Sequence, residues 1–70
     1  MIKFTLGFDS EYIELIKLLK VTNICGSGGE AKAIVDDGQV KLNGQTESRK
    51  RAKLRKGDKI EVFNKTIIIE

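Results

Sequence analysis

A short run between positions 49 and 56, RKRAKLRK, holds the side chains of this chain best suited to bind a polyanion. Six of its eight residues are Lys or Arg and none is acidic. Arginine presents a planar fork to phosphate oxygens and lysine adds a compact point charge. The whole chain holds 13 basic and 10 acidic residues, so seven basic and ten acidic residues remain outside the run. This segregation predicts a local positive field and an anionic partner.

The two apolar residues of the run, Ala52 and Leu54, are spaced by two. In an extended segment, side chains alternate between the two faces, so both would point into a core. We therefore expect Arg51, Lys53 and Arg55 to project together on the opposite, solvent-exposed side. The alternative is that the run is only a solvated face, although six like charges in eight residues repel one another without a counter-charge.

The residues before the run predict a strand followed by a helix. Apolar residues alternate with polar ones over residues 2–6, which is the period of a half-buried strand that ends at Gly7. Asp9 or Ser10 can then cap a helix over residues 10–19, with acidic residues in its first turn and lysines in its last. Its apolar residues cover more than half of its circumference. A helix packed on two sides is favoured over one lying on a membrane, because its polar face mixes both signs of charge.

A second helix is predicted over residues 28–37. Ser27 and Glu30 have the spacing of a capping box. Gly38 can end the helix in the left-handed conformation that glycine often adopts there. Gly28 and Gly29 allow two interpretations. They can simply form a tight entry to the helix, or they can let a phosphate approach the exposed N–H groups of its first turn.

The rest of the chain predicts short antiparallel strands joined by tight turns. Asn43-Gly44 is the preferred dipeptide for a type I′ hairpin, a second turn is expected at residues 56–58, and a third at Asn64-Lys65 before a final strand over residues 66–70. The predicted fold is α+β, with two packed helices against a small, mainly antiparallel β-sheet. Seventy residues predict a single domain over residues 1–70.

The composition argues against several classes of protein. Cys25 is the only cysteine and there is no histidine, so neither an intrachain disulfide nor a zinc site is expected. No nucleophile has a nearby base, so we expect neither an enzyme nor a cofactor. The chain lacks the apolar stretch of a signal peptide or a membrane span, which predicts a cytoplasmic protein.

Three segments resemble, in their order and spacing, the S4-type RNA-binding domain in its short stand-alone form. They are LIKLL in the first helix, SGGEAKAIVDDGQVKLNG across the second helix and hairpin, and ESRKRAKLRKGDKIEV after it. In that family, two helices and the following loop form the L-shaped αL motif, whose basic face rests on structured RNA. The resemblance, which runs from about Leu15 to Val62, implies the same fold and partner here. It places at RNA-facing positions Lys32, Lys41, Asn43, Arg49, Lys50, Arg51 and Lys53.

Two positions depart from the common S4 pattern. Many S4 domains begin the first helix with Arg-Leu-Asp and open the second with Ser-Arg, whereas the matching residues here are Glu11-Tyr12-Ile13 and Ser27-Gly28. Two arginines that contact RNA in such domains are therefore missing. We therefore expect residues 49–56 to make a larger share of the RNA contacts.

Two functional hypotheses from different classes stay open. The first is a non-enzymatic module that binds structured RNA, ribosomal or transfer. Folded RNA is favoured over single strands, because most of the four aromatic residues occupy apparent core positions and offer no stacking platform. The second is an adaptor whose basic face binds an acidic protein. A pull-down with nuclease treatment separates them, since only the adaptor should still recover a protein.

Overall fold

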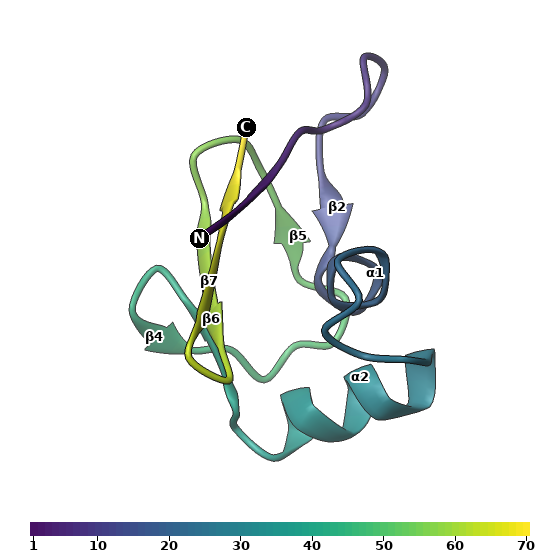
Figure 1. The fold of residues 1–70 in the computed structure, drawn as a ribbon, viewed down its shortest axis with the longest axis vertical. Helices are drawn as coiled ribbons and strands as arrows, with labels where there is room; N and C mark the ends of the chain where they lie inside the picture. The colour runs from purple at the N-terminus through teal and green to yellow at the C-terminus, as the bar shows by residue number, and fades with distance from the viewer.

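The computed structural model describes residues 1–70 and contains seven short strands and two helices (Figure 1). The strands are β1 (Ile2–Phe4), β2 (Ile13–Glu14), β3 (Val40–Leu42), β4 (Gln45–Thr46), β5 (Lys53–Leu54), β6 (Lys59–Val62) and β7 (Lys65–Ile69). The helices are α1 (Leu15–Val21) and α2 (Gly28–Asp36). Neither helix is long and apolar enough to cross a membrane.

Five of the strands form one sheet in the order β1-β7-β6-β3-β4, and β2 and β5 form a separate two-stranded ladder. Only β1 pairs in parallel, with β7, and every other pairing is antiparallel. The predicted α+β fold with a mainly antiparallel sheet is therefore confirmed. Alternating residues of the central strands, such as Ile60 and Val62 of β6 and Ile67 and Ile69 of β7, are buried, so the sheet has one inward face.

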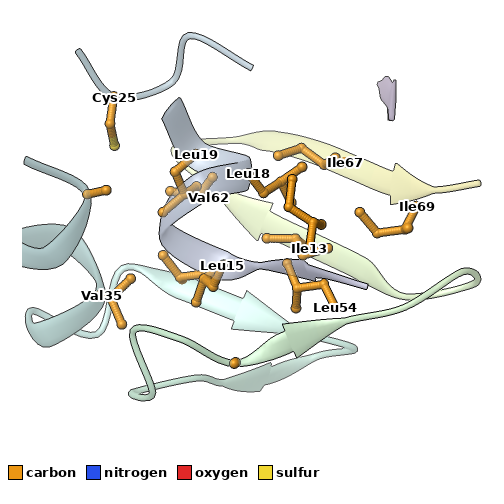
Figure 2. Close-up of a cluster of buried hydrophobic side chains, with 14 residues drawn as sticks. Ile13, Leu15, Leu18, Leu19, Cys25, Val35, Leu54, Val62, Ile67 and Ile69 are labelled. Atoms are coloured by element: carbon orange, nitrogen blue, oxygen red, sulfur yellow. The ribbon is translucent and has the colours of Figure 1, made fainter. Parts of the chain in front are cut away.

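The core lies between that face, the helices and the small ladder. Figure 1 shows α1 and α2 next to each other at one side of the larger sheet. Fourteen apolar residues form the buried cluster, ten of which are labelled in Figure 2. Leu15, Leu18 and Leu19 of α1 are fully buried, and Val35 of α2 joins them. In Figure 2, Ile13 and Leu54 lie side by side, so the ladder contributes its own side chains to this core.

The first helix is shorter than predicted and starts at Leu15 instead of residue 10. Asp9 and Ser10 do not cap it, and the N-cap residue Glu14 makes no side-chain hydrogen bond to the helix. The reason is tertiary: β2 pairs with β5, which holds Ile13 and Glu14 in an extended conformation. Short apolar runs suit a helix or a strand. Here the pairing with a strand some 40 residues away in sequence overrides the helical periodicity.

The second helix starts at Gly28, as predicted, and ends at Asp36, one residue before the predicted end. The Ser27 hydroxyl accepts a hydrogen bond of 3.2 Å from the Glu30 N–H, which confirms Ser27 as the N-cap. The Glu30 carboxylate accepts from the N–H of Gly26 at 3.4 Å, one residue before the partner expected in a capping box. Gly38 follows the helix with a φ of +75°, the left-handed conformation predicted for it.

Of two predicted tight turns, one lies where it was predicted and the other is shifted. Asn43 and Gly44 have φ angles of 51° and 87°, which agrees with the predicted type I′ turn. The later turn lies at Phe63 and Asn64, with φ of 50° and 63°, one residue earlier than predicted. Val62 pairs with Lys65, so the hairpin turn consists of Phe63 and Asn64 alone. Strand β7 accordingly runs from Lys65 to Ile69.

Candidate nucleic-acid interface

Residues 49–56, here called the basic segment, turn once and then run extended. Lys50 and Arg51 lie in a turn closed by a 3.2 Å hydrogen bond from the Ala52 N–H to the Arg49 carbonyl, and only Lys53 and Leu54 form a strand. The expectation of an extended conformation thus holds for the second half of the segment and is wrong for the turn. The alternation itself is confirmed, because Ala52 and Leu54 are buried while the basic residues Arg51, Lys53 and Arg55 are exposed.

The backbone of the basic segment is tied to the first helix. The N–H groups of Leu15 and Ile16 donate hydrogen bonds of 3.0 and 3.1 Å to the carbonyls of Ala52 and Lys50. These amides belong to the first turn of α1, whose donors have no partner within the helix. The segment therefore takes the place of a side-chain cap, and its backbone is fixed to α1.

The far end of the basic segment is held by the turn that follows it. The Arg55 N–H donates to the Asp58 carboxylate at 2.8 Å, and the Asp58 N–H donates to the Arg55 carbonyl at 3.0 Å. Gly57, with a φ of +95°, donates its N–H to the Ile69 carbonyl at 2.8 Å. Hydrogen bonds thus fix the backbone beneath the cations at both ends of the segment.

The cations of the segment differ in their ionic partners. The Arg49 guanidinium bonds both carboxylate oxygens of Glu47, at 2.9 and 3.1 Å. This hydrogen bonding lowers the pKa of Glu47 and raises that of Arg49. Lys50 pairs with Asp36 at 3.1 Å, at the end of α2. These are the only two ion pairs in the structure, so Arg51, Lys53, Arg55 and Lys56 have no carboxylate partner.

The other predicted contact residues lie outside the basic segment, on different elements. Lys32 is exposed on α2, and Lys41 is exposed on β3, on the outer face of the larger sheet. Gly28 and Gly29 open α2, at the end of the helix away from the Lys50–Asp36 pair. A Cβ at either glycine would meet its nearest neighbour at 3.9 Å, which is ordinary contact. Packing alone therefore does not require glycine there.

The amide of Asn43 is occupied within the protein. Its Nδ2 donates to the Asp58 carboxylate at 3.2 Å, and its Oδ1 accepts from the Lys59 N–H at 2.9 Å. Asn43 therefore connects the hairpin turn to the turn that ends the basic segment. Sequence reasoning had no signal for these bonds, because the partners lie 15 and 16 residues away.

The aromatic side chains are more exposed than the sequence suggested, and this corrects the expectation that most are in the core. Phe8 is fully exposed, Phe63 is 48% exposed and Tyr12 is 40% exposed, so only Phe4 packs against the core. Tyr12 lies beside the basic segment. The Lys53 Nζ and the Arg55 Cζ lie over its ring, 5.0 and 5.8 Å from the centroid.

Tyr12 is therefore a residue of this surface that the sequence reasoning missed. The signal in the sequence was its place one residue before Ile13. That signal could be used only once the pairing of β2 with β5 was known.

Cys25 lies apart from this surface and is buried. Burial, with a smaller contribution from the nearby Glu30 charge, raises the pKa of its thiol. The thiolate is the reactive form of cysteine, so this environment disfavours reaction at Cys25. The residue acts as a small apolar side chain of the core.

Comparison with known proteins gives concordant matches. The S4 domain family matches residues 6–70. YbcJ of Escherichia coli (strain K12) is 40% identical over 60 residues, which cover 86% of this chain and 84% of YbcJ. The "Probable ribosome maturation protein RlbA" of Bacillus subtilis (strain 168) is 33% identical over 57 residues, covering 81% of this chain and 80% of RlbA.

A solved structure extends these matches to the fold. The solution structure of E. coli YbcJ, described as revealing an αL motif involved in RNA-binding, superposes with a TM-score of 0.74 at 35% sequence identity. The match covers 99% of this chain and 86% of YbcJ. The helix pair and following loop described above correspond to that αL motif.

Proposed function

Because the chain belongs to the S4 domain family, we propose that it is a non-enzymatic RNA-binding protein, which docks its αL motif and basic segment on structured RNA in the cytoplasm. Residues 1–70 act in this proposal as one binding module. The observation that carries it is the group of exposed cations without carboxylate partners on a backbone fixed to α1. Such a surface binds phosphates at little conformational cost to the main chain.

The contact residues fall into three groups by their state in the free protein. Arg51, Lys53 and Arg55 bind phosphates directly. Arg49 and Lys50 exchange their carboxylate partners for phosphates, and Lys32 and Lys41 extend the positive surface along α2 and β3.

The two glycines and Asn43 have different roles in the proposal. Gly28 and Gly29 leave the start of α2 open to a phosphate. Asn43 bonds to Asp58 and Lys59 and so holds the hairpin against the turn that ends the basic segment.

Ribosomal RNA is the target that the comparisons favour over transfer RNA. The name of RlbA associates that relative with ribosome maturation, and RlbA shares a third of its residues with this chain over four fifths of the length. We extend this to the present chain as part of the proposal. Crosslinking followed by sequencing of the bound RNA tests it, and recovery of transfer RNA alone would reject the ribosomal assignment.

The RNA-binding function itself is tested by the salt dependence of binding to a structured RNA. Affinity should fall linearly with salt on a log–log plot, by about 0.7 to 0.9 in slope for each phosphate neutralised. Arg51→Ala should flatten the slope by about one contact and weaken all RNAs alike. Lys3→Ala is the matched control, because Lys3 is exposed on β1, away from the basic segment.

Two outcomes would reject this proposal. One is a parent slope retained in Arg51→Ala but flattened in Lys3→Ala, which would place the binding face elsewhere. The other is a pull-down from nuclease-treated lysate in which the chain recovers an acidic protein, and recovery depends on the same cations, while the chain shows no measurable affinity for RNA. That result would identify the chain as a protein-binding adaptor.

A further inference from the structure

The side chain of Tyr12 is placed on the outer side of the small ladder by strand register. Ile13 pairs with Leu54 and Glu14 with Lys53, so Tyr12 lies opposite Arg55 one step further along. Ile13 and Leu54 point into the core, 8% and 0% exposed. By the alternation of side chains, Tyr12 shares the outer face with Lys53 and Arg55.

Nothing in the fold requires an aromatic residue at this position. The ring is 40% exposed and lies outside the buried cluster, and its hydroxyl makes no hydrogen bond within the protein. Its specific contacts are with the two cations, neither of which has a carboxylate partner. An aromatic face and two phosphate-binding groups thus meet at one point, which is the combination that binds a nucleotide.

A surface depression adjoins the ring. It has a volume of about 590 Å³, and its lining includes the apolar side chains of Leu6 and Val21, the Tyr12 ring itself, and an excess of carboxylates over cations, namely Asp9, Glu11 and Glu14 against Lys17. These carboxylates repel phosphate, whereas the apolar side chains accept the flat face of a base. The charges therefore favour one orientation of a nucleotide, with the base toward the depression and the phosphate toward Lys53 and Arg55.

We propose that Tyr12, Lys53 and Arg55 form a subsite for one unpaired nucleotide of the bound RNA. This inference rests on the proposed RNA-binding function and deepens it. The base stacks on the Tyr12 ring, and the adjoining phosphate binds the two cations. In the free protein the cations lie over the ring; because cation–π attraction at an exposed site is weaker than base stacking, the RNA displaces them from the ring onto its phosphate.

The experiment uses two RNA hairpins that differ in one feature: a fully paired stem, and the same stem with a single unpaired nucleotide. We expect the bulged hairpin to bind the parent protein about tenfold more tightly, the low end of what one stacked base contributes. Tyr12 is the only tyrosine and the chain has no tryptophan, so intrinsic fluorescence reports on this ring alone. The bulged hairpin should quench that emission after correction for RNA absorbance with free N-acetyltyrosinamide.

Two variants separate stacking from support of the cations. Tyr12→Phe keeps the ring and should keep the tenfold preference. Tyr12→Leu removes it and should bind the two hairpins alike with an unchanged salt slope, because no charge is lost. Should Tyr12→Leu fold poorly, the quenching of the parent and the preference of Tyr12→Phe still decide the matter.

Three results would overturn the subsite. The parent could bind both hairpins equally, or Tyr12→Leu could keep the preference for the bulge. Thirdly, Tyr12→Leu could weaken both hairpins equally and flatten the salt slope, which would make Tyr12 only a support for Lys53 and Arg55. In each of these cases the protein still binds RNA, and the proposed function stands. Failure of the parent to bind either hairpin would reject both together.

Discussion

The N–H of Leu15 donates a 3.0 Å hydrogen bond to the carbonyl oxygen of Ala52, which joins the start of the first helix to the middle of the basic segment. The Leu15 and Ala52 side chains are both buried beside this bond. The main chain that carries the cations therefore cannot shift without uncovering helix donors and opening the core. The basic segment and the αL helix pair are therefore joined rigidly, and in the proposed function the cations would bind RNA from a fixed backbone.

The N-cap of the second helix gives a direct test of that helix pair. Ser27→Ala removes the hydroxyl that accepts from the Glu30 N–H, and should lower the free energy of unfolding by about 1 kcal/mol. Ser10→Ala is the matched control, since Ser10 was one of two capping candidates for the first helix by sequence but does not cap it. Thermal or urea unfolding of both variants measures the difference. Equal stability of the two would mean that the Ser27 bond contributes nothing in solution.

Local signals of the sequence predicted α2 and its neighbouring turns well. Ser27, Glu30 and Gly38 act within a few residues of themselves, so their spacing determines the ends of α2. The same holds for the Asn43-Gly44 turn, where both residues must adopt positive φ. Alternation in the basic segment likewise identified the buried Leu54.

Features that depend on distant pairing could not be predicted in this way. The start of α1 and the exposure of Tyr12 follow from β2 pairing with β5, and the apolar run around Ile13 suits a helix equally well. The sequence also could not show which cations of the basic segment form ion pairs. Glu47 lies two residues from Arg49, but whether they bond depends on side-chain geometry that spacing does not reveal.

The contact between Asn43 and Asp58 can be tested by exchanging the two side chains. Asn43→Asp keeps a residue that tolerates positive φ, but it loses the Nδ2 donor and sets two carboxylates against each other. We expect a loss of about 1 kcal/mol in unfolding free energy. Adding Asp58→Asn should restore most of it, because the new amide can donate in the reverse direction while its oxygen still accepts from Arg55.

A double-mutant cycle by urea unfolding gives the coupling energy between these two positions. Additive losses in the double variant would show that the two side chains do not interact in solution. The salt slope of RNA binding should stay unchanged in the folded double variant, because the exchange leaves the net charge as it is.

Leu54 anchors the basic segment in the core, so shortening its side chain should lower the stability of the protein strongly. Leu54 is fully buried, so Leu54→Ala should cost about 2–5 kcal/mol in unfolding free energy. Leu42→Ala is the comparison, because Leu42 is only half-buried at the edge of the same core and should cost less. Equal losses in the two variants would contradict the packing of Leu54 against Ile13.

The pair of Glu47 and Arg49 predicts a specific dependence of stability on pH. Hydrogen bonding from Arg49 lowers the pKa of Glu47 in the folded protein, so the unfolded chain takes up this proton at a higher pH. The stabilisation is present above the ordinary glutamate pKa of about 4.3 and is lost as the pH falls through the lowered value. Glu47→Gln should therefore show a shallower loss of stability below about pH 4 than the parent, measured by urea unfolding at each pH.

The same substitution should strengthen RNA binding at neutral pH. In the parent, the Arg49 guanidinium is held by both oxygens of Glu47, and phosphate must compete with that carboxylate. Glu47→Gln frees Arg49, so we expect higher affinity for a structured RNA and a salt slope steeper by about one contact. Glu70→Gln is the matched control, because it removes one exposed negative charge that belongs to neither ion pair and does not line the depression beside Tyr12. A control that raises affinity and slope as much as Glu47→Gln would show that only net charge matters, and that Arg49 makes no contact of its own.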